Sequence, residues 1–148
     1  MQWAALIAWI VTAGGGFVLL VTWLVRGGLR QRERGRIRPP LIFSHFLLAA
    51  AGLVLWIVYL ADDKSALAWI ALGILGAVAL LGFTMFALWM PQYQRRRGGM
   101  RPVVAGGAGD EPAVAAETHF PVPIVVLHGL LGATTIVLVL LSALEIGT

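Results

Sequence analysis

Two of the three histidines of this 148-residue chain lie in segments that match one another. The first segment reads PLIFSHFLLA from Pro40, and the second reads PIVVLHGLLG from Pro123. In both, the histidine follows the proline by five residues and is itself followed by a Leu-Leu pair. Imidazole binds protons and metal ions, so His45 and His128 are the side chains best suited to chemistry. Their matched surroundings indicate one site to which both contribute.

The elements that must position these histidines are apolar and long. Hydrophobic residues make up 59% of the chain and charged residues 12%, which is more apolar than an ordinary soluble domain. A helix needs about 20 apolar residues to cross a membrane, and four stretches without Asp, Glu, Lys or Arg meet that length. The fold predicted is therefore an all-α, four-helix transmembrane up-and-down bundle, with spans at residues 3–25, 41–61, 66–90 and 122–144.

Charge placement predicts how the bundle is oriented. Ten of the eleven basic residues follow the first or the third span, and Lys64 alone lies between the second and the third. Basic loops next to spans stay in the cytoplasm and contact anionic head groups, so both termini are expected outside and no nucleic-acid partner is expected. The preference for Arg over Lys and the abundant Ala, Gly and Val favour a GC-rich bacterium, and hence a multi-pass protein of a bacterial inner membrane.

The remaining composition limits the cofactors. The chain has no cysteine, which excludes disulfides, thiolate metal sites, iron–sulfur clusters and haem attached through thiols. Between the third and fourth spans, residues 91–121 are predicted to form a flexible cytoplasmic loop, because residues 98–118 are dominated by Gly, Ala, Pro and Val without a helical or strand period.

The match between the two halves extends beyond the histidines. Gly16-Phe17 followed by Trp23 has the same spacing as Gly82-Phe83 followed by Trp89. The two Gly-Phe motifs are closer to one another in the chain than the two histidines are, and the longer second loop accounts for the difference. The chain is therefore predicted to consist of two duplicated helical hairpins, related by an axis along the membrane normal.

The repeat predicts the depth and direction of the two imidazoles. Each histidine lies about 7 Å along its helix from the proline that precedes it, so both should lie at one depth and face the bundle interior. At helical spacing after each histidine the residues are small, which predicts a slot between the helices. A haem b with His45 and His128 as axial ligands would fit there, with Arg36 and Arg38 as possible partners of the propionates. The small residues are Ala49, Gly52, Gly132 and Thr135.

In this respect the chain resembles the membrane b-type cytochromes, in which histidines on helices of a four-helix core ligate haem at matched depths. The resemblance covers the two histidine helices and implies one bis-histidine haem and electron transfer with a quinone or a redox partner subunit. The chain departs from larger members of that class because it has no second histidine pair near the opposite surface. At most one haem is implied, and electrons would move at the cytoplasmic face or through a partner.

Other interpretations of the histidine pair remain open. The chain is alternatively a structural or assembly subunit of a larger membrane complex, whose histidines tie helices together. A quinone site, a proton path or a metal path is a further possibility, whereas a transporter is disfavoured because no span carries a charge. No nucleophile with a base supports hydrolase or transferase chemistry. His119 is expected to be a solvated loop residue, although Glu117 and His119 together are candidates for a metal or a haem edge.

Overall fold

The computed structural model of the chain describes residues 1–30, 35–62, 64–98 and 115–145. Within these ranges the regular structure is entirely helical, with four long α-helices and one short 3-10 helix. The elements are α1 (Gln2–Val25), α2 (Pro39–Asp62), α3 (Ser65–Arg97), η1 (Ala116–His119) and α4 (Val122–Ala143).

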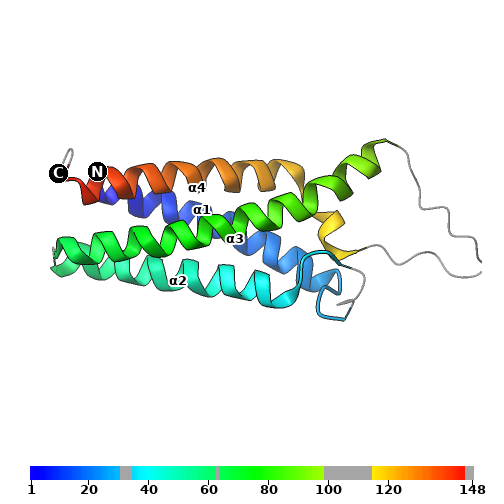
Figure 1. Cartoon of the computed structure of the whole chain (residues 1–148), viewed down its shortest axis with the longest axis horizontal. Coiled ribbons are helices and arrows are strands. Elements are labelled where there is room, and N and C mark those ends of the chain that lie inside the picture. The colour runs from blue at the N-terminus through cyan, green and yellow to red at the C-terminus, as the bar shows by residue number, and fades with distance from the viewer. Residues whose placement is uncertain (31–34, 63, 99–114, 146–148) are drawn as a thin grey trace, which may run out of the picture.

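The four α-helices run alternately up and down side by side (Figure 1). Each is long and apolar enough to cross a membrane, which confirms the predicted four-helix bundle and is the property of a multi-pass membrane protein. Both chain termini lie at one end, together with the turn between α2 and α3 (Figure 1). We call this the termini end, and the opposite end, which carries residues 26–30, 35–38, 91–98 and 115–121, the arginine end.

The helix boundaries follow the predicted spans within two residues, except at the end of α3. Pro39 and Pro40 occupy the first turn of α2, where the missing proline N–H leaves no hydrogen bond unmade. Helix α3 continues through Pro91 to Arg97, so part of the segment predicted as a loop is helical. Of the predicted flexible loop, residues 99–114 lie outside the described residues.

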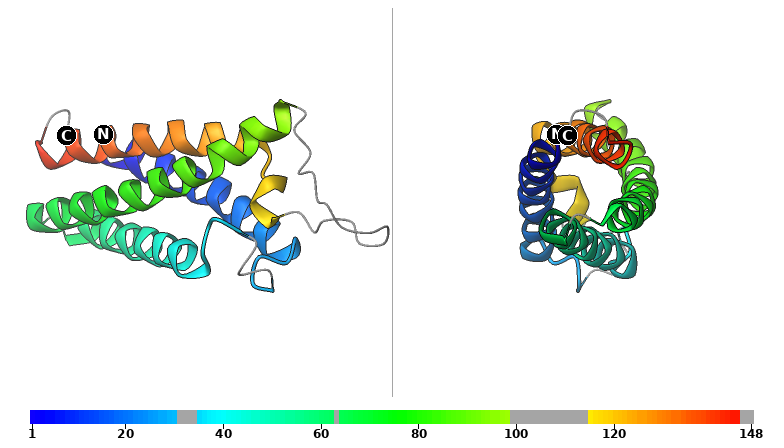
Figure 2. Two further views of the ribbon diagram at one scale, coloured as in Figure 1. Left: turned by 45° about the vertical axis from the view of Figure 1, so that its right-hand side comes forward. Right: turned by 90° about the vertical axis from the view of Figure 1, so that its left-hand side faces the viewer.

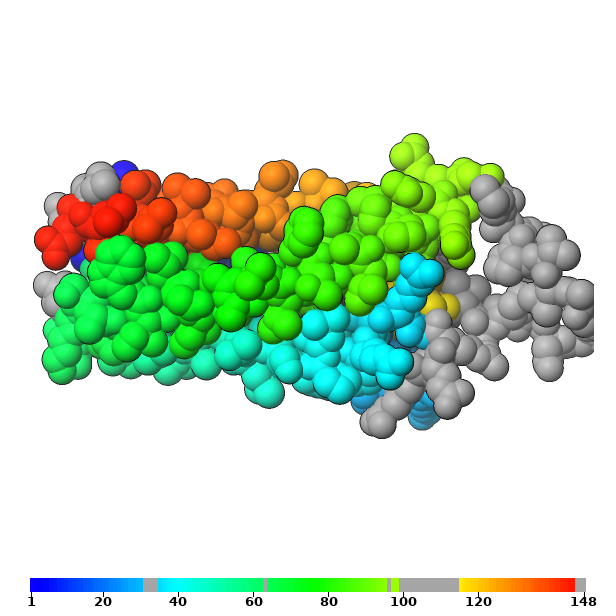
Figure 3. Space-filling view, in the orientation of Figure 1, coloured from blue at the N-terminus to red at the C-terminus, as the bar shows by residue number. Residues whose placement is uncertain are grey.

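The helices do not pack on one another equally. The closest pairs are α2 with α3 and α1 with α4, whereas α1 and α2 share few contacts. The outward surface of the bundle, one face of which appears in Figure 3, carries many large apolar side chains, as expected where the solvent is lipid. The side chains with more than half of their surface exposed include Trp3, Phe17, Leu47, Leu80 and Phe83.

The buried core is divided into two clusters along the bundle axis. The cluster at the termini end is built around Trp9 and Trp56, and the cluster at the arginine end is built around Trp23 and Trp89. On α1 the tryptophans of the two clusters are separated by about 20 Å of helix. Small and polar residues occupy the intervening level, which is where His45 and His128 lie.

The short helix η1 lies across the arginine end of the bundle (Figure 2). Its Glu117 is 1% exposed, and the Oε1 atom accepts hydrogen bonds from the backbone N–H of Arg36 at 2.6 Å and from the Gln92 amide at 3.1 Å. No described side chain forms an ion pair with this carboxylate. Glu117 thus joins the segment before α2, helix α3 and η1 through hydrogen bonds alone.

Replacing Glu117 with alanine is expected to lower the free energy of unfolding by about 1–3 kcal/mol, because two donors at the bundle end lose their acceptor. Glu117→Gln keeps an acceptor oxygen at the same place and should cost less. Thermal unfolding of the purified protein in detergent measures both changes. Equal stability of Glu117→Ala and the unaltered protein would show that these hydrogen bonds do not hold the arginine end together.

Candidate functional site

The structure brings His45 of α2 and His128 of α4 together between the two core clusters. Their ring centroids are 6.2 Å apart and the ring planes are inclined by 64°. Both side chains are partly buried. The two rings therefore lie at one level of the bundle and face its interior, as the repeat predicted.

A backbone carbonyl of a neighbouring helix holds each ring. His45 Nδ1 lies 3.0 Å from the carbonyl oxygen of Val78 in α3, and His128 Nδ1 lies 2.9 Å from that of Thr12 in α1. Because a carbonyl oxygen only accepts hydrogen bonds, Nδ1 carries the proton in each ring. In the neutral imidazole the remaining lone pair is then on Nε2, which is the arrangement usual for a histidine that ligates a metal.

Each ring also packs against a glycine of the same neighbouring helix. A Cβ atom built on Gly16 would lie 2.9 Å from His128 Cε1, and one built on Gly82 would lie 3.1 Å from His45 Cε1. In a helix, residue i+4 lies over residue i, and each glycine is four residues beyond the carbonyl that its histidine reaches. The absence of a side chain is what lets the ring approach that carbonyl.

These contacts occur twice, once in each half of the sequence repeat. Thr12 and Val78 are separated along the chain by the same interval as Gly16 and Gly82. Residues that the duplication makes equivalent therefore make equivalent contacts with the paired histidines. The Gly-Phe motif was the sequence signal for these two glycines, but the carbonyl partners carry no signal because any residue type supplies a carbonyl.

The small residues after each histidine do not all line open space. Gly52 is buried, and a Cβ atom there would lie 3.0 Å from the indole of Trp9. The expectation that Gly52 leaves a slot is wrong, because Trp9 uses that space for helix packing. Thr135 is also buried, and its hydroxyl lies 3.3 Å from that of Thr12.

The other small positions are less crowded. Ala49 and Gly132 are partly buried, and a Cβ atom on Gly132 would meet only the Thr12 methyl group, at 3.9 Å. The predicted space is therefore confined to the level nearest the histidines. Trp9 bounds it on the side of the termini end.

The two arginines predicted to meet haem propionates lie at the arginine end. Arg36 and Arg38 precede α2, and both are exposed to solvent. The backbone N–H of Arg36 bonds to Glu117. No described contact joins either guanidinium to the histidine pair, so their role stays a prediction.

His119 and Glu117 differ from expectation because they are not solvated loop residues. Both belong to η1; Glu117 is buried, and His119 Nδ1 is buried without a hydrogen-bond partner. The glycine and alanine stretches near them in the sequence are typical of a loop, so this packing was not predicted. Among the residues that the structure describes, no three His, Cys, Asp or Glu side chains gather to hold a metal ion.

A shallow cavity of about 260 Å³ lies beside His128, between α1 and α4. Gly14 and Gly15 form one wall, and Leu127 and Leu131 form the other. At the equivalent positions of the other half, just before Gly82, the chain has Leu80 and Leu81 instead of glycines. The two halves of the repeat therefore differ in sequence at this wall of the cavity.

Comparisons of the chain with protein-family models, with curated proteins and with solved structures found no match in any of the three. The chemistry of the site has to be argued from its geometry. Two imidazoles that meet inside the bundle, each with its Nδ1 proton fixed on a carbonyl, can hold one metal centre or tie the helices together.

Proposed function

We propose that the protein is a small membrane haem-b protein in which His45 and His128 are the axial ligands of one haem, and that it transfers electrons. The observation that carries this proposal is the meeting of the two imidazoles at the centre of the bundle, 6.2 Å apart between centroids. The four spans contain no Asp or Glu, and His45 and His128 are their only histidines.

The ring spacing fits a single metal centre. A metal held by both Nε2 atoms at about 2 Å would separate the ring centroids by about 6 Å, since each nitrogen lies about 1 Å from its ring centre. The observed separation is 6.2 Å. Two rings packed edge to face are also separated by about 4.5–7 Å between centroids, so the spacing is compatible with ligation and with direct packing.

The chain also supplies what two axial ligands need from their surroundings. The carbonyls of Thr12 and Val78 fix the Nδ1 protons and hold the ring orientations, which raises the basicity of the opposite nitrogen. Along α1, Trp9 lies on one side of the level at which the two histidines meet, and Trp23 lies on the other side. Bound haem supplies one-electron redox chemistry in such a site.

The arginine end completes the proposal. Arg36 and Arg38 are exposed there and are suited to hydrogen-bond with propionate groups. Basic loops mark the cytoplasmic side, so we place both termini outside, in a bacterial inner membrane whose anionic head groups contact the arginines. The electron partner is a quinone or a redox subunit of a larger membrane complex.

One observation favours a second function, that of a structural or assembly subunit. Each histidine already bonds to a neighbouring helix, His45 to α3 and His128 to α1. A hydrogen bond between helices in lipid contributes about 0.6–2 kcal/mol, so the same contacts would stabilise a bundle that carries no cofactor.

The absorption spectrum of the purified protein distinguishes the two functions. After expression with ample haem supply, a bis-histidine haem protein shows a Soret band and sharp visible bands on reduction, with about one haem per chain. We expect this spectrum. A colourless protein that is folded by circular dichroism would leave the structural function as the better one.

A further inference from the structure

The short helix η1 spans the arginine end of the bundle between two opposite helices. It contacts α1 and α3, which do not contact one another within the described residues (Figure 2). Its Ala116 packs in one cluster with Trp23 of α1 and Trp89 of α3. These tryptophans follow Gly16 and Gly82, the glycines in contact with the histidine rings, by seven residues. Helix η1 therefore lies about 10 Å along the bundle axis from the histidine pair.

One atom of η1 lacks the partner that its surroundings demand. Among the buried side-chain nitrogen and oxygen atoms of the described residues, Nδ1 of His119 is the one without a hydrogen-bond partner. Nearly all buried polar atoms in folded proteins have such a partner, and an imidazole nitrogen can either donate or accept a hydrogen bond. A polar group from outside the chain would satisfy this atom.

The histidine pair sets the direction in which a haem edge would meet η1. His45 and His128 belong to α2 and α4, which are the other two opposite helices. Because axial ligands lie on the two faces of a macrocycle, the haem plane would be perpendicular to the line from α2 to α4. The plane would then contain the direction from α1 to α3, which is the direction that η1 spans. The haem edge nearest the arginine end would lie along η1.

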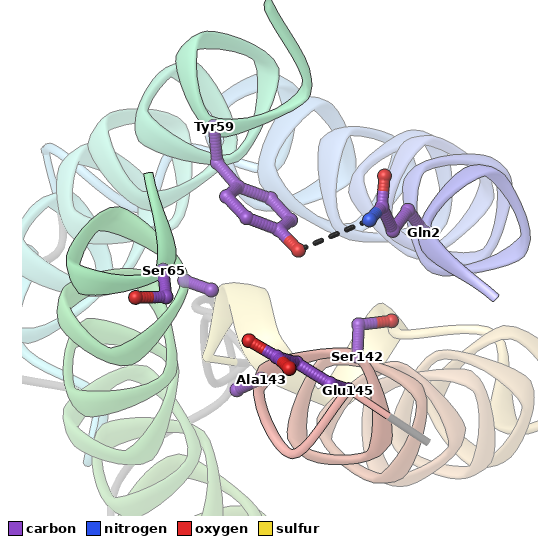
Figure 4. Close-up of a pocket in the computed structure, with 7 residues that line it drawn as sticks. Gln2, Tyr59, Ser65, Ser142, Ala143 and Glu145 are labelled. Carbon is purple, nitrogen blue, oxygen red and sulfur yellow. Dashed lines mark hydrogen bonds between the residues drawn. The ribbon is translucent and has the colours of Figure 1, made fainter. Parts of the chain in front are cut away.

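The termini end is less suited to the propionate edge of a haem. Trp9 packs against Gly52 on that side of the histidines, and the cavity beyond is lined in part by Glu145, whose carboxylate repels an anion (Figure 4). The Gln2 amide in that cavity donates to the Tyr59 hydroxyl at 3.1 Å. The arginine end instead carries basic side chains, which bind carboxylates. The propionates would therefore point toward η1.

The acidic residue of η1 does not oppose this orientation. Glu117 and His119 are two residues apart in a helix with three residues per turn, so their side chains leave η1 in directions about 120° apart. Oε1 of Glu117 accepts hydrogen bonds from the Arg36 backbone N–H and the Gln92 amide. These bonds hold the carboxylate toward α3 and the segment before α2, and His119 Nδ1 takes no part in them.

We infer that His119 donates a hydrogen bond from Nδ1 to a propionate of the bound haem. The inference rests on the proposed haem function, and it makes η1 the element that recognises the carboxylate edge of the cofactor. A neutral imidazole carries its single proton on either nitrogen, and a facing carboxylate fixes it on Nδ1. Arg36 and Arg38 are exposed, whereas this donor is buried, so water weakens its bond to a propionate least.

Haem and haem dimethyl ester, which lacks both propionate charges, are the probes. Each is titrated into the full chain prepared in detergent without haem, and the Soret absorbance gives the affinity. His119→Leu should weaken the affinity for haem about tenfold and the affinity for the ester by less than about twofold. The band positions should not change, because both axial ligands remain. His119→Asn keeps an N–H donor near the position of Nδ1 and should recover most of the affinity for haem.

The stability of the haem-free protein separates this role from a role in packing. Because Nδ1 has no partner in the protein alone, His119→Leu should leave the unfolding temperature of the haem-free chain unchanged or raise it. Gln92→Ala is the matched control, since it removes a donor from the Glu117 carboxylate at the same end. It should lower the unfolding temperature, and any loss of affinity should be equal for haem and for the ester.

The outcomes for the inference and for the haem function are distinguishable. If the unaltered protein is folded by circular dichroism and binds neither probe, the haem function fails and the inference fails with it. If haem binds with a bis-histidine spectrum, but His119→Leu changes the affinities for haem and for the ester equally or not at all, the inference alone is overturned. That second result is the one expected if a water molecule satisfies Nδ1.

Discussion

Alanine at either His45 or His128 is expected to abolish the six-coordinate haem spectrum that we propose for this protein. The two rings are 6.2 Å apart, and no other described histidine lies between them, so neither can be replaced from within the site. Visible spectra of the oxidised and reduced protein, with haem quantified per chain, measure the effect. The same substitutions also remove a bond to Val78 or Thr12, and a loss of about 1 kcal/mol in stability should accompany them.

Two controls separate loss of a ligand from loss of the fold. His119→Ala removes the third histidine, which lies in η1 at the arginine end, and should leave the spectrum intact. Added imidazole should restore a six-coordinate spectrum in His128→Ala, because the substitution leaves room for a free ring. A spectrum that survives His45→Ala or His128→Ala unchanged would rule out axial ligation by that residue.

Alanine at Gly16 or Gly82 is expected to damage the site without touching a ligand. The new Cβ atom would lie 2.9 Å from His128 Cε1 or 3.1 Å from His45 Cε1, so the ring must move away from the carbonyl that holds it. Overpacking of this kind costs about 1–3 kcal/mol. We expect a lower unfolding temperature and a weakened or high-spin haem spectrum.

The chain offers close controls for this test. Gly14→Ala and Gly76→Ala are in the same helices, and an added Cβ there meets nothing within 4 Å, so both should be neutral or slightly stabilising. Combining Gly16→Ala with His128→Ala should show strong coupling, because the methyl group costs little once the ring is gone. Additive effects on stability would show that the glycine and the ring do not interact.

Much of the bundle could be predicted from the sequence because lipid imposes simple rules. The apolar spans, their order and the first turn at Pro39 and Pro40 follow from hydropathy and proline chemistry. The meeting of His45 and His128 followed from the repeat, since equivalent residues of a duplicated fold lie at one depth.

The sequence did not show which side chain fills which space. Gly52 was expected to leave a slot, but the rotation of α1 brings Trp9 against it, and relative helix rotation is not encoded in a hydropathy pattern. The burial of Glu117 was not predicted for another reason. A segment in which a charged residue follows many glycines and alanines has the composition of a solvated loop. Its burial depends on Arg36 and Gln92, which are distant in the sequence.

The pairing of the helices sets an order for biosynthesis. Helices α2 and α3 are consecutive and pack closely, whereas the main partner of α1 is α4, which is made after the other three. The contacts of His45 with Val78 and Gly82 can therefore form while the ribosome is still at work. Helix α1 is in the bilayer without its principal packing partner until α4 inserts. The contacts of His128 with Thr12 and Gly16 form only then, so the second half of the site is completed after the first.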